Sequence, residues 1–314
     1  MATSLPTPAT TLPETDLTSP ADSAFAKSLA LGANFVRWLL MALNLSCLDA
    51  PLVAVTWQAF AADVFQIQLS GSRVALLALA IWCAYAGDRW LDGFRLTSKS
   101  ASPRHRFARR FRIEMAVVLF LGIAAALVIA GRELSGGIAF SSWLLAGTAL
   151  VFIAGTFTSP TLFRARLPRE LIVGSLVAAA VCLFPFEAPS ESLFPKMVFA
   201  ASIALLFATN GLVIARSEHP RDLLLGEASA ATRWPRVMEK LRPFLWIAMA
   251  TSATISLAAG FALSSAAPSV VLAILAIAFA GLLWVDRSKI ATDLKPVAAD
   301  LALLAPWLML FYEL

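Results

Sequence analysis

Nine long apolar runs limit what this chain can fold into. Each run has close to the roughly 20 residues that an α-helix needs to cross the hydrocarbon core of a bilayer. The runs are 49–68, 73–92, 113–131, 138–157, 169–186, 196–216, 243–263, 267–285 and 296–312. Of the 314 residues, 59% are hydrophobic and 14% are charged, against about 25% charged in a soluble domain. The sequence therefore predicts an all-α polytopic membrane protein, a bundle of about nine transmembrane helices, and excludes a soluble enzyme.

The N-terminal region differs from the rest in composition. Residues 1–25 are rich in Thr, Pro, Ser and Ala and lack the basic start of a signal peptide, so we expect a disordered tail. The remainder, 26–314, is expected to form a single transmembrane domain. It opens with the apolar run 29–46, in which Arg37 stands beside Trp38. That pattern is typical of a helix lying in the membrane interface, and a short extra span is the alternative.

The distribution of basic residues predicts the orientation. Most of the 25 lysines and arginines fall in the loops after the second, fourth, sixth and eighth spans, with seven in 95–112 and six in 216–242. The net charge of +5 would suggest nucleic-acid binding in a soluble protein, but here the positive-inside bias explains it without a nucleic-acid partner. We expect these loops and the N-terminus to be cytoplasmic, in a bacterial inner (cytoplasmic) membrane.

Two acidic residues stand at the end of the second span. Asp88 and Asp92 are four residues apart in the sequence DRWLD, which puts both carboxylates on one face of a helix. Like charges at that spacing repel, so a cation should offset them. The alternatives are a divalent metal ion, a bound cationic group, or simple neutralisation by Arg89 and Arg95 where the helix crosses into the headgroups.

A second acidic pair follows the sixth span. Glu218 and Asp222 have the same spacing of four, and Asn210 lies two turns earlier on the same face. Pro220 falls between the two acids and is able to kink or end the helix there. The alternative interpretation is therefore a capped turn, with Ser217 as the N-cap of a cytoplasmic helix.

Both pairs fall at the predicted cytoplasmic ends of even-numbered spans. If they face one another, they form a clamp for two metal ions. Mg²⁺ is usually bound by one or two carboxylates together with substrate phosphates. The many arginines nearby suit a diphosphate, which a planar guanidinium binds through two hydrogen bonds. The sequence thus predicts a Mg²⁺ and diphosphate site on the inner side of the membrane.

This pattern resembles the UbiA-type superfamily of intramembrane aromatic prenyltransferases, over residues 45–312. That family has an N-D-x-x-D-x-x-x-D motif at the cytoplasmic end of its second helix and a D-x-x-x-D motif after its sixth. Asp88 and Asp92 match the last two aspartates of the first motif, whereas Ala84 and Tyr85 stand where the family has Asn and Asp. Glu218 and Asp222 match the second motif, and the segment 164–174 also looks like its family counterpart.

The resemblance implies a lipid-open central cavity and transfer of a polyprenyl group from its diphosphate to a lipophilic, aromatic acceptor. The four acids would bind Mg²⁺ and carry catalysis: Asp88, Asp92, Glu218 and Asp222. Three arginines would bind the diphosphate: Arg95, Arg164 and Arg169. Three further residues would line the pocket: Tyr85, Asn210 and Asp300. For Asp300, which follows Pro296 by four residues, the alternative is a favourable charge near a helix N-terminus.

Two other functions compete with the enzyme. The first is a catalytically degenerate relative that binds a lipid or pigment or helps a membrane assembly form, which the replacement at Tyr85 favours. The second is a small-molecule transporter. Transporter sites lie near the middle of the membrane, whereas the polar residues here gather at one face, so we rank the transporter lowest.

Overall fold

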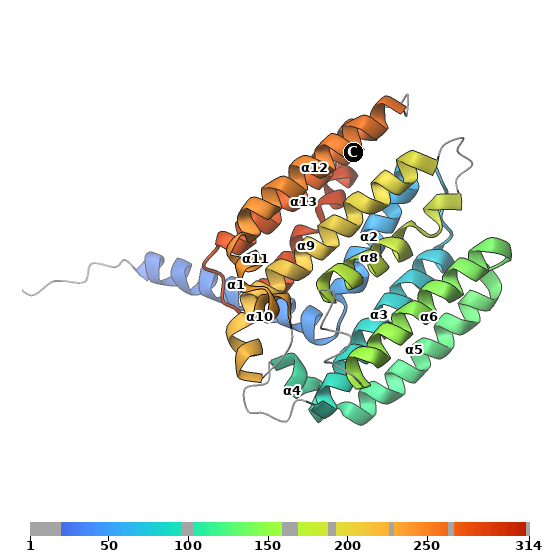
Figure 1. Cartoon of the computed structure of the whole chain (residues 1–314). Helices are drawn as coiled ribbons and strands as arrows, with labels where there is room; N and C mark the ends of the chain where they lie inside the picture. The colour runs from blue at the N-terminus through green and yellow to red at the C-terminus, as the bar shows by residue number, and fades with distance from the viewer. Residues whose placement is uncertain are drawn as a thin grey trace, which may run out of the picture. The chain divides into compact units, whose positions relative to one another are not determined.

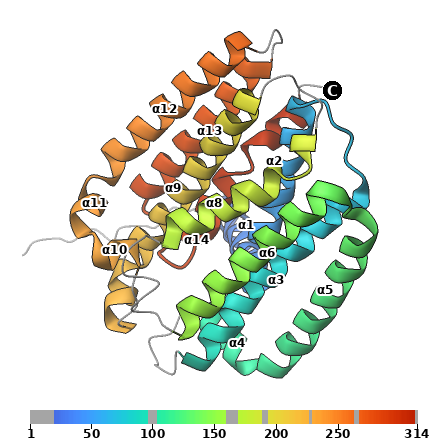
Figure 2. The same cartoon turned by 45° about the vertical axis from the view of Figure 1, so that its right-hand side comes forward.

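The computed structural model describes residues 20–95, 103–158, 169–187, 193–225, 229–262 and 267–311. It forms two units, Met1–Leu39 and Leu40–Leu314. The described part of the first unit is the beginning of helix α1. The second unit holds the last turn of α1 and every other element (Figures 1 and 2).

The described residues form helices joined by short turns, and contain no strand. The helices are α1 (Pro20–Leu45), α2 (Asp49–Val64), α3 (Gly71–Arg95), α4 (Pro103–Arg110), α5 (Arg112–Glu133), α6 (Gly136–Thr158), α8 (Arg169–Cys182), α9 (Leu193–Leu225), α10 (Ala230–Arg233), α11 (Pro235–Glu239), α12 (Leu241–Ala262), α13 (Ala267–Arg287) and α14 (Lys295–Ala302). Two 3₁₀ segments complete them, η1 (Pro185–Glu187) and η2 (Ala305–Phe311). Each predicted span overlaps a helix, although α2 and α8 end before their predicted spans do and the last span is divided into α14 and η2. The all-helical prediction is therefore confirmed for the described residues.

Five described helices are long and apolar enough to cross a membrane: α3, α5, α6, α9 and α13. The number rises to six if α2 and the end of α1, which meet at a sharp break, count as one span. α2 and α8 have only 16 and 14 residues, short of the roughly 20 that a full crossing needs. These apolar helices indicate an integral membrane protein. Nine spans, the cavity, the bacterial inner membrane and the cytoplasmic N-terminus stay predictions.

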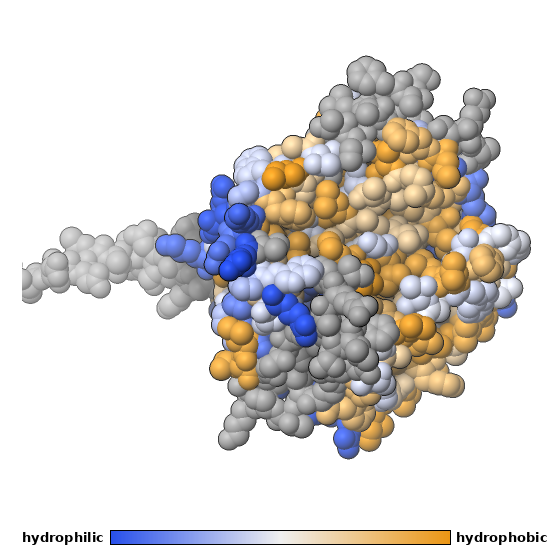
Figure 3. All heavy atoms as spheres, in the orientation of Figure 1, coloured by the Kyte–Doolittle hydropathy of each residue, from blue (hydrophilic) through white to orange (hydrophobic). Residues whose placement is uncertain are grey.

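The apolar core lies among α2, α8, α9, α12, α13 and α14. Trp57 on α2 is fully buried, packs edge-on against Phe207 of α9, and donates its indole N–H to the carbonyl of Leu303 at 2.7 Å. The hydroxyl of the preceding residue, Thr56, accepts a hydrogen bond from the Trp307 indole. α5 and α6 contribute little to this core and expose most of their apolar side chains, as expected for lipid-facing helices. Figure 3 shows hydrophobic residues over much of the described surface on one side of the molecule.

Ion pairs gather the basic ends of several helices at one end of the bundle. Asp286, at the end of α13, accepts from Arg242 at the start of α12 at 2.8 Å and lies 3.4 Å from Arg216 on α9. Arg169, at the start of α8, pairs with Asp88 near the end of α3. These contacts join helix ends that border the loops predicted to be cytoplasmic.

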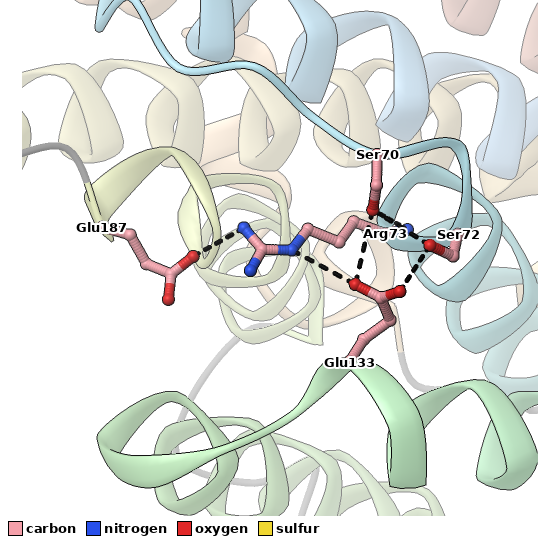
Figure 4. A network of polar contacts seen from close by, with 5 residues as sticks. All are labelled: Ser70, Ser72, Arg73, Glu133 and Glu187. Atoms are coloured by element: carbon pink, nitrogen blue, oxygen red, sulfur yellow. Dashed lines mark hydrogen bonds and ion pairs between the residues drawn. The ribbon is translucent and has the colours of Figure 1, made fainter.

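The opposite end is joined by a smaller network (Figure 4). Arg73, in the first turn of α3, lies 3.4 Å from Glu133 at the end of α5 and donates to Glu187 of η1 at 2.7 Å. The hydroxyls of Ser70 and Ser72 donate to the same Glu133 carboxylate. One guanidinium thus connects α3, α5 and the segment after α8.

Removing this guanidinium should weaken the bundle slightly. Its partners are partly exposed, and such pairs contribute about 0.2–1 kcal/mol each. We expect Arg73→Gln, which removes two such pairs, to lower the free energy of unfolding by about 0.4–2 kcal/mol in detergent micelles at low salt, and by less at about 0.5 M salt, where screening is strong. Thermal unfolding measures this, with Arg132→Gln, an exposed arginine on α5, as the control. An equal loss in both variants would contradict a specific role for the network.

Candidate functional site

The first acidic pair lies where α3 approaches α8. Asp92 is buried, with 8% of its surface exposed, and Asp88 forms an ion pair with Arg169, the first residue of α8. A guanidinium therefore offsets one of the two carboxylates, and it comes from a segment 81 residues away rather than from a neighbour on the same helix. Arg169 is the one predicted diphosphate-binding arginine whose side chain falls within the described residues, and it pairs with an acid of the first pair.

The second acidic pair lies on an unbroken helix. α9 continues through Pro220 to Leu225, and the Ser217 hydroxyl bonds back to the Ile214 carbonyl inside the helix. The alternative in which Ser217 caps a new helix is therefore wrong. Glu218 and Asp222 keep the shared face that their spacing predicted, and Arg221 lies 3.7 Å from Glu218.

The close approach of α8 to α9 shows which way the face carrying Glu218 and Asp222 points. Gly174 on α8 lies so near Ala208 that a Cβ at Gly174 would be 2.4 Å from the Ala208 backbone nitrogen. About one turn along, Gly211 meets the side chain of Glu170. Because positions 208, 211, 215, 218 and 222 recur at helical spacing, both acids of the second pair lie on the α8-facing side of α9. Asn210 is about 200° around the helix from Ala208 and bonds to α14 instead, so the prediction that it shares their face is wrong.

The same register gives the position of the second acidic pair along the axis of α9. Glu218 follows Gly211 by seven residues, about 10 Å along the axis at 1.5 Å per residue. Since Gly211 already lies level with Glu170, the second residue of α8, Glu218 and Asp222 extend past the start of α8. The two acidic pairs thus border the same helix start, one through the Asp88–Arg169 ion pair and the other through the face of α9.

Two of the predicted pocket residues are in direct contact. The Asn210 side-chain amide on α9 donates to a carboxylate oxygen of Asp300 on α14 at 2.7 Å, and both residues are 8% exposed. The amide oxygen of Asn210 is buried and has no hydrogen-bond partner among the described residues. Asp300 is therefore held by a long-range contact, which the helix-terminus alternative did not require. A polar group of a ligand would be the natural partner for the remaining oxygen.

The third pocket candidate belongs to a different cluster. The Tyr85 hydroxyl accepts from the guanidinium of Arg89 at 2.6 Å, and its ring lies 4.2 Å from that guanidinium. Arg89 is buried and also donates to the carbonyl of Asn44, just before the break between α1 and α2. The Asn44 side chain in turn donates to Asp49, the first residue of α2, at 2.8 Å. Tyr85 thus helps hold the start of α2 against α3.

Two of the three predicted diphosphate-binding side chains are not described. The side chain of Arg95 and the whole of Arg164 lie outside the described residues. Among the described residues, no three His, Cys, Asp or Glu side chains gather closely enough to hold a metal ion by themselves. The acids are instead arranged as two pairs, and pairs fit a Mg²⁺ ion that takes its other ligands from a phosphate and water.

Sequence reasoning missed Glu170. One carboxylate oxygen accepts the backbone N–H of Ala230 at the start of α10, and the other is buried without a hydrogen-bond partner among the described residues. The Nδ1 atom of His219, beside the second acidic pair, is buried and unpartnered in the same sense. An acid in the first turn of a helix is common for dipole reasons alone, so nothing in the sequence singled out Glu170.

Comparison with known proteins adds no relative: no family model, curated protein or solved structure matches the chain. The chemistry of the site therefore rests on its own residues. These are four acids in two pairs, a guanidinium between two helices, and a buried amide–carboxylate contact.

Proposed function

We propose that this protein is a Mg²⁺-dependent, prenyltransferase-like membrane enzyme, similar to the UbiA-type superfamily. It would transfer a polyprenyl group from its diphosphate to a lipophilic, aromatic acceptor. The observation that carries the proposal is the Asp88–Arg169 ion pair, because it sets an acidic pair and an anion-binding guanidinium side by side at the start of α8. The α8-facing direction of Glu218 and Asp222 supports the same location.

The residues suit a diphosphate held through metal ions. Asp88 with Asp92, and Glu218 with Asp222, would each hold a Mg²⁺ ion whose remaining ligands are diphosphate oxygens and water. When bound, Mg²⁺ neutralises the charge of the leaving diphosphate. Arg169 would move from Asp88 to the diphosphate oxygens, where a planar guanidinium pairs with two oxygens at once.

In the proposed reaction, the allylic carbon–oxygen bond breaks and its electron pair leaves with the diphosphate. The acceptor's aromatic carbon forms the new carbon–carbon bond, and the acceptor loses the proton that this carbon carried. This chain's own contribution is to bind and orient the two partners and to exclude water from the electron-poor carbon. The buried Asn210 amide oxygen is suited to accept a hydrogen bond from a polar group of the acceptor.

The test is turnover by the purified full-length protein in micelles with labelled isoprenoid diphosphates and a panel of lipophilic aromatic acceptors. We expect pyrophosphate release and a prenylated lipid in the presence of Mg²⁺, and neither after addition of EDTA. Release that continues unchanged in EDTA would contradict the proposed chemistry.

One observation favours the non-catalytic alternative. Tyr85 stands where the family has a metal ligand. Here its hydroxyl accepts a hydrogen bond from Arg89, in a contact that holds helices together. A relative that kept the bundle but lost turnover would bind a lipid or pigment without Mg²⁺. The same assay separates the two functions: a lipophilic molecule that stays bound in EDTA, with no pyrophosphate released under any condition, identifies the binding protein.

A further inference from the structure

The short helix α4 carries a strong positive charge beside the lipid-facing helices. Residues 103–113 contain five arginines and no acidic residue. In both ribbon views α4 lies by the end of α3 and the beginning of α5 (Figures 1 and 2). It is at the same end of the bundle as the acidic pairs but belongs to neither of them.

α4 is fixed to α3 by a close contact. Ala108 is 2% exposed, and a Cβ at Gly93 would lie 3.4 Å from the Arg109 backbone nitrogen and 3.7 Å from the Ala108 methyl. This contact leaves little freedom to rotate α4 about its axis. The face carrying Ala108 therefore points to α3, and the opposite face points away from the bundle.

Two arginines occupy the outward face. Arg106 and Arg110 are one turn apart and lie about 160° and 200° around the helix from Ala108, at 100° per residue. Both are exposed. The outward face thus presents two positive charges one turn apart. Phe107 and Phe111 form a ring pair on one flank, and the Arg110 guanidinium lies 5.7 Å from the Phe111 ring.

Neighbouring residues set this face at the level of the membrane interface. The Trp90 indole on α3 donates to the Arg112 carbonyl at the start of α5 at 2.8 Å and packs edge-on against Phe94. Phe94 and Ile113 are 49% and 69% exposed, as side chains facing lipid would be. Amphipathic aromatic residues at the end of a span typically lie at headgroup depth. The arginines of α4 are therefore next to lipid rather than next to bulk solvent alone.

We propose that the outward face of α4 binds the phosphate groups of anionic phospholipids in the adjoining leaflet, with Arg106 and Arg110 as its charged residues. The sign of the charge on this face and the lipid-exposed neighbours together select an acidic lipid as the occupant. This site is separate from the proposed reaction and does not depend on it.

Native mass spectrometry of the full-length protein tests the proposal by measuring the dissociation constants of phosphatidylglycerol and phosphatidylcholine with identical acyl chains. Each arginine near an anionic surface contributes about a fivefold factor in affinity. We expect the R106Q/R110Q variant to lose roughly 30-fold in phosphatidylglycerol affinity and to keep its phosphatidylcholine affinity. The matched control is R233Q/R236Q, which removes the same charge from exposed positions on α10 and α11.

Three results would overturn the proposal. Unchanged phosphatidylglycerol affinity in R106Q/R110Q excludes the site. An equal loss in the control variant assigns the effect to the overall charge of this end. Competition by inorganic phosphate at matched concentration identifies a small-anion site instead. A thermal-unfolding scan in lipid-free micelles accompanies each measurement, and only variants with the wild-type melting temperature are compared.

Discussion

Replacing Gly174 with alanine is expected to lower the melting temperature of the protein by roughly 5–10 °C, at about 2–4 °C per kcal/mol. The added Cβ would lie 2.4 Å from the backbone nitrogen of Ala208 and 2.8 Å from its Cα. Both atoms belong to the backbone of α9, so no side-chain rotation relieves the clash, and the two helices have to separate. Overpacking of this kind costs about 1–3 kcal/mol or more.

The same substitution at an open position gives the matched control. Gly147 on α6 has nothing within 4 Å of an added Cβ. Alanine is favoured over glycine inside a helix by about 0.5–1 kcal/mol, so Gly147→Ala should raise the melting temperature slightly. The two variants are expected to change stability with opposite signs in the same detergent. Stabilisation of the protein by Gly174→Ala would contradict the close packing of α8 on α9.

That packing also explains why a stability change at Gly174 should reach the candidate site. Glu170 lies about one turn before Gly174 on α8 and rests against Gly211 of α9. The Asp88–Arg169 ion pair is formed at the same helix start. Separation of α8 from α9 would therefore move the Arg169 side of the site relative to Glu218.

The helices were predictable from the sequence because membrane-spanning segments are recognisable by their length and hydropathy. It did not predict that α2 and α8 fall short of a full crossing. α8 ends at Cys182, shortly before Pro185, and α2 ends just before Gln66, which has a left-handed backbone conformation. Apolar residues continue past both ends, so a pattern of hydropathy alone extended these helices too far.

The acidic pairs were predictable because residues four apart in a helix lie on the same face. Their partners were not, since each comes from elsewhere in the chain. Arg169 is 81 residues from Asp88, and Asp300 is 90 residues from Asn210. The role of Tyr85 was also hidden: its position suggested a pocket, whereas its partner Arg89, one turn later on α3, also bonds to Asn44, 45 residues away, where α1 meets α2. Long-range contacts of this kind follow from packing, which no local motif records.

Asp88→Asn is expected to abolish stabilisation of the protein by Mg²⁺ and an isoprenoid diphosphate. The probe is an unreactive thiolo analogue of the diphosphate, so binding is measured without turnover. At 100 times its dissociation constant, a ligand that binds only the folded state stabilises it by about 2.7 kcal/mol. Asparagine keeps the size of the side chain and removes the charge that Mg²⁺ requires. With a reactive diphosphate, turnover should fall by about 10²–10³-fold or more, the cost of losing one major electrostatic group.

Two further variants separate the roles that Asp88 combines. Arg169→Met breaks the same ion pair but leaves both carboxylates of the first pair, so the Mg²⁺-dependent shift in melting temperature should persist at a weaker diphosphate affinity. Asp63→Asn makes the same chemical change at an exposed position on α2 and should leave the shift intact. If Asp88→Asn retains the wild-type shift, or if EDTA leaves that shift unchanged, Asp88 is a structural partner of Arg169 and not a metal ligand. A shift that disappears in Asp88→Asn and survives in both other variants requires the carboxylate itself to act at the metal.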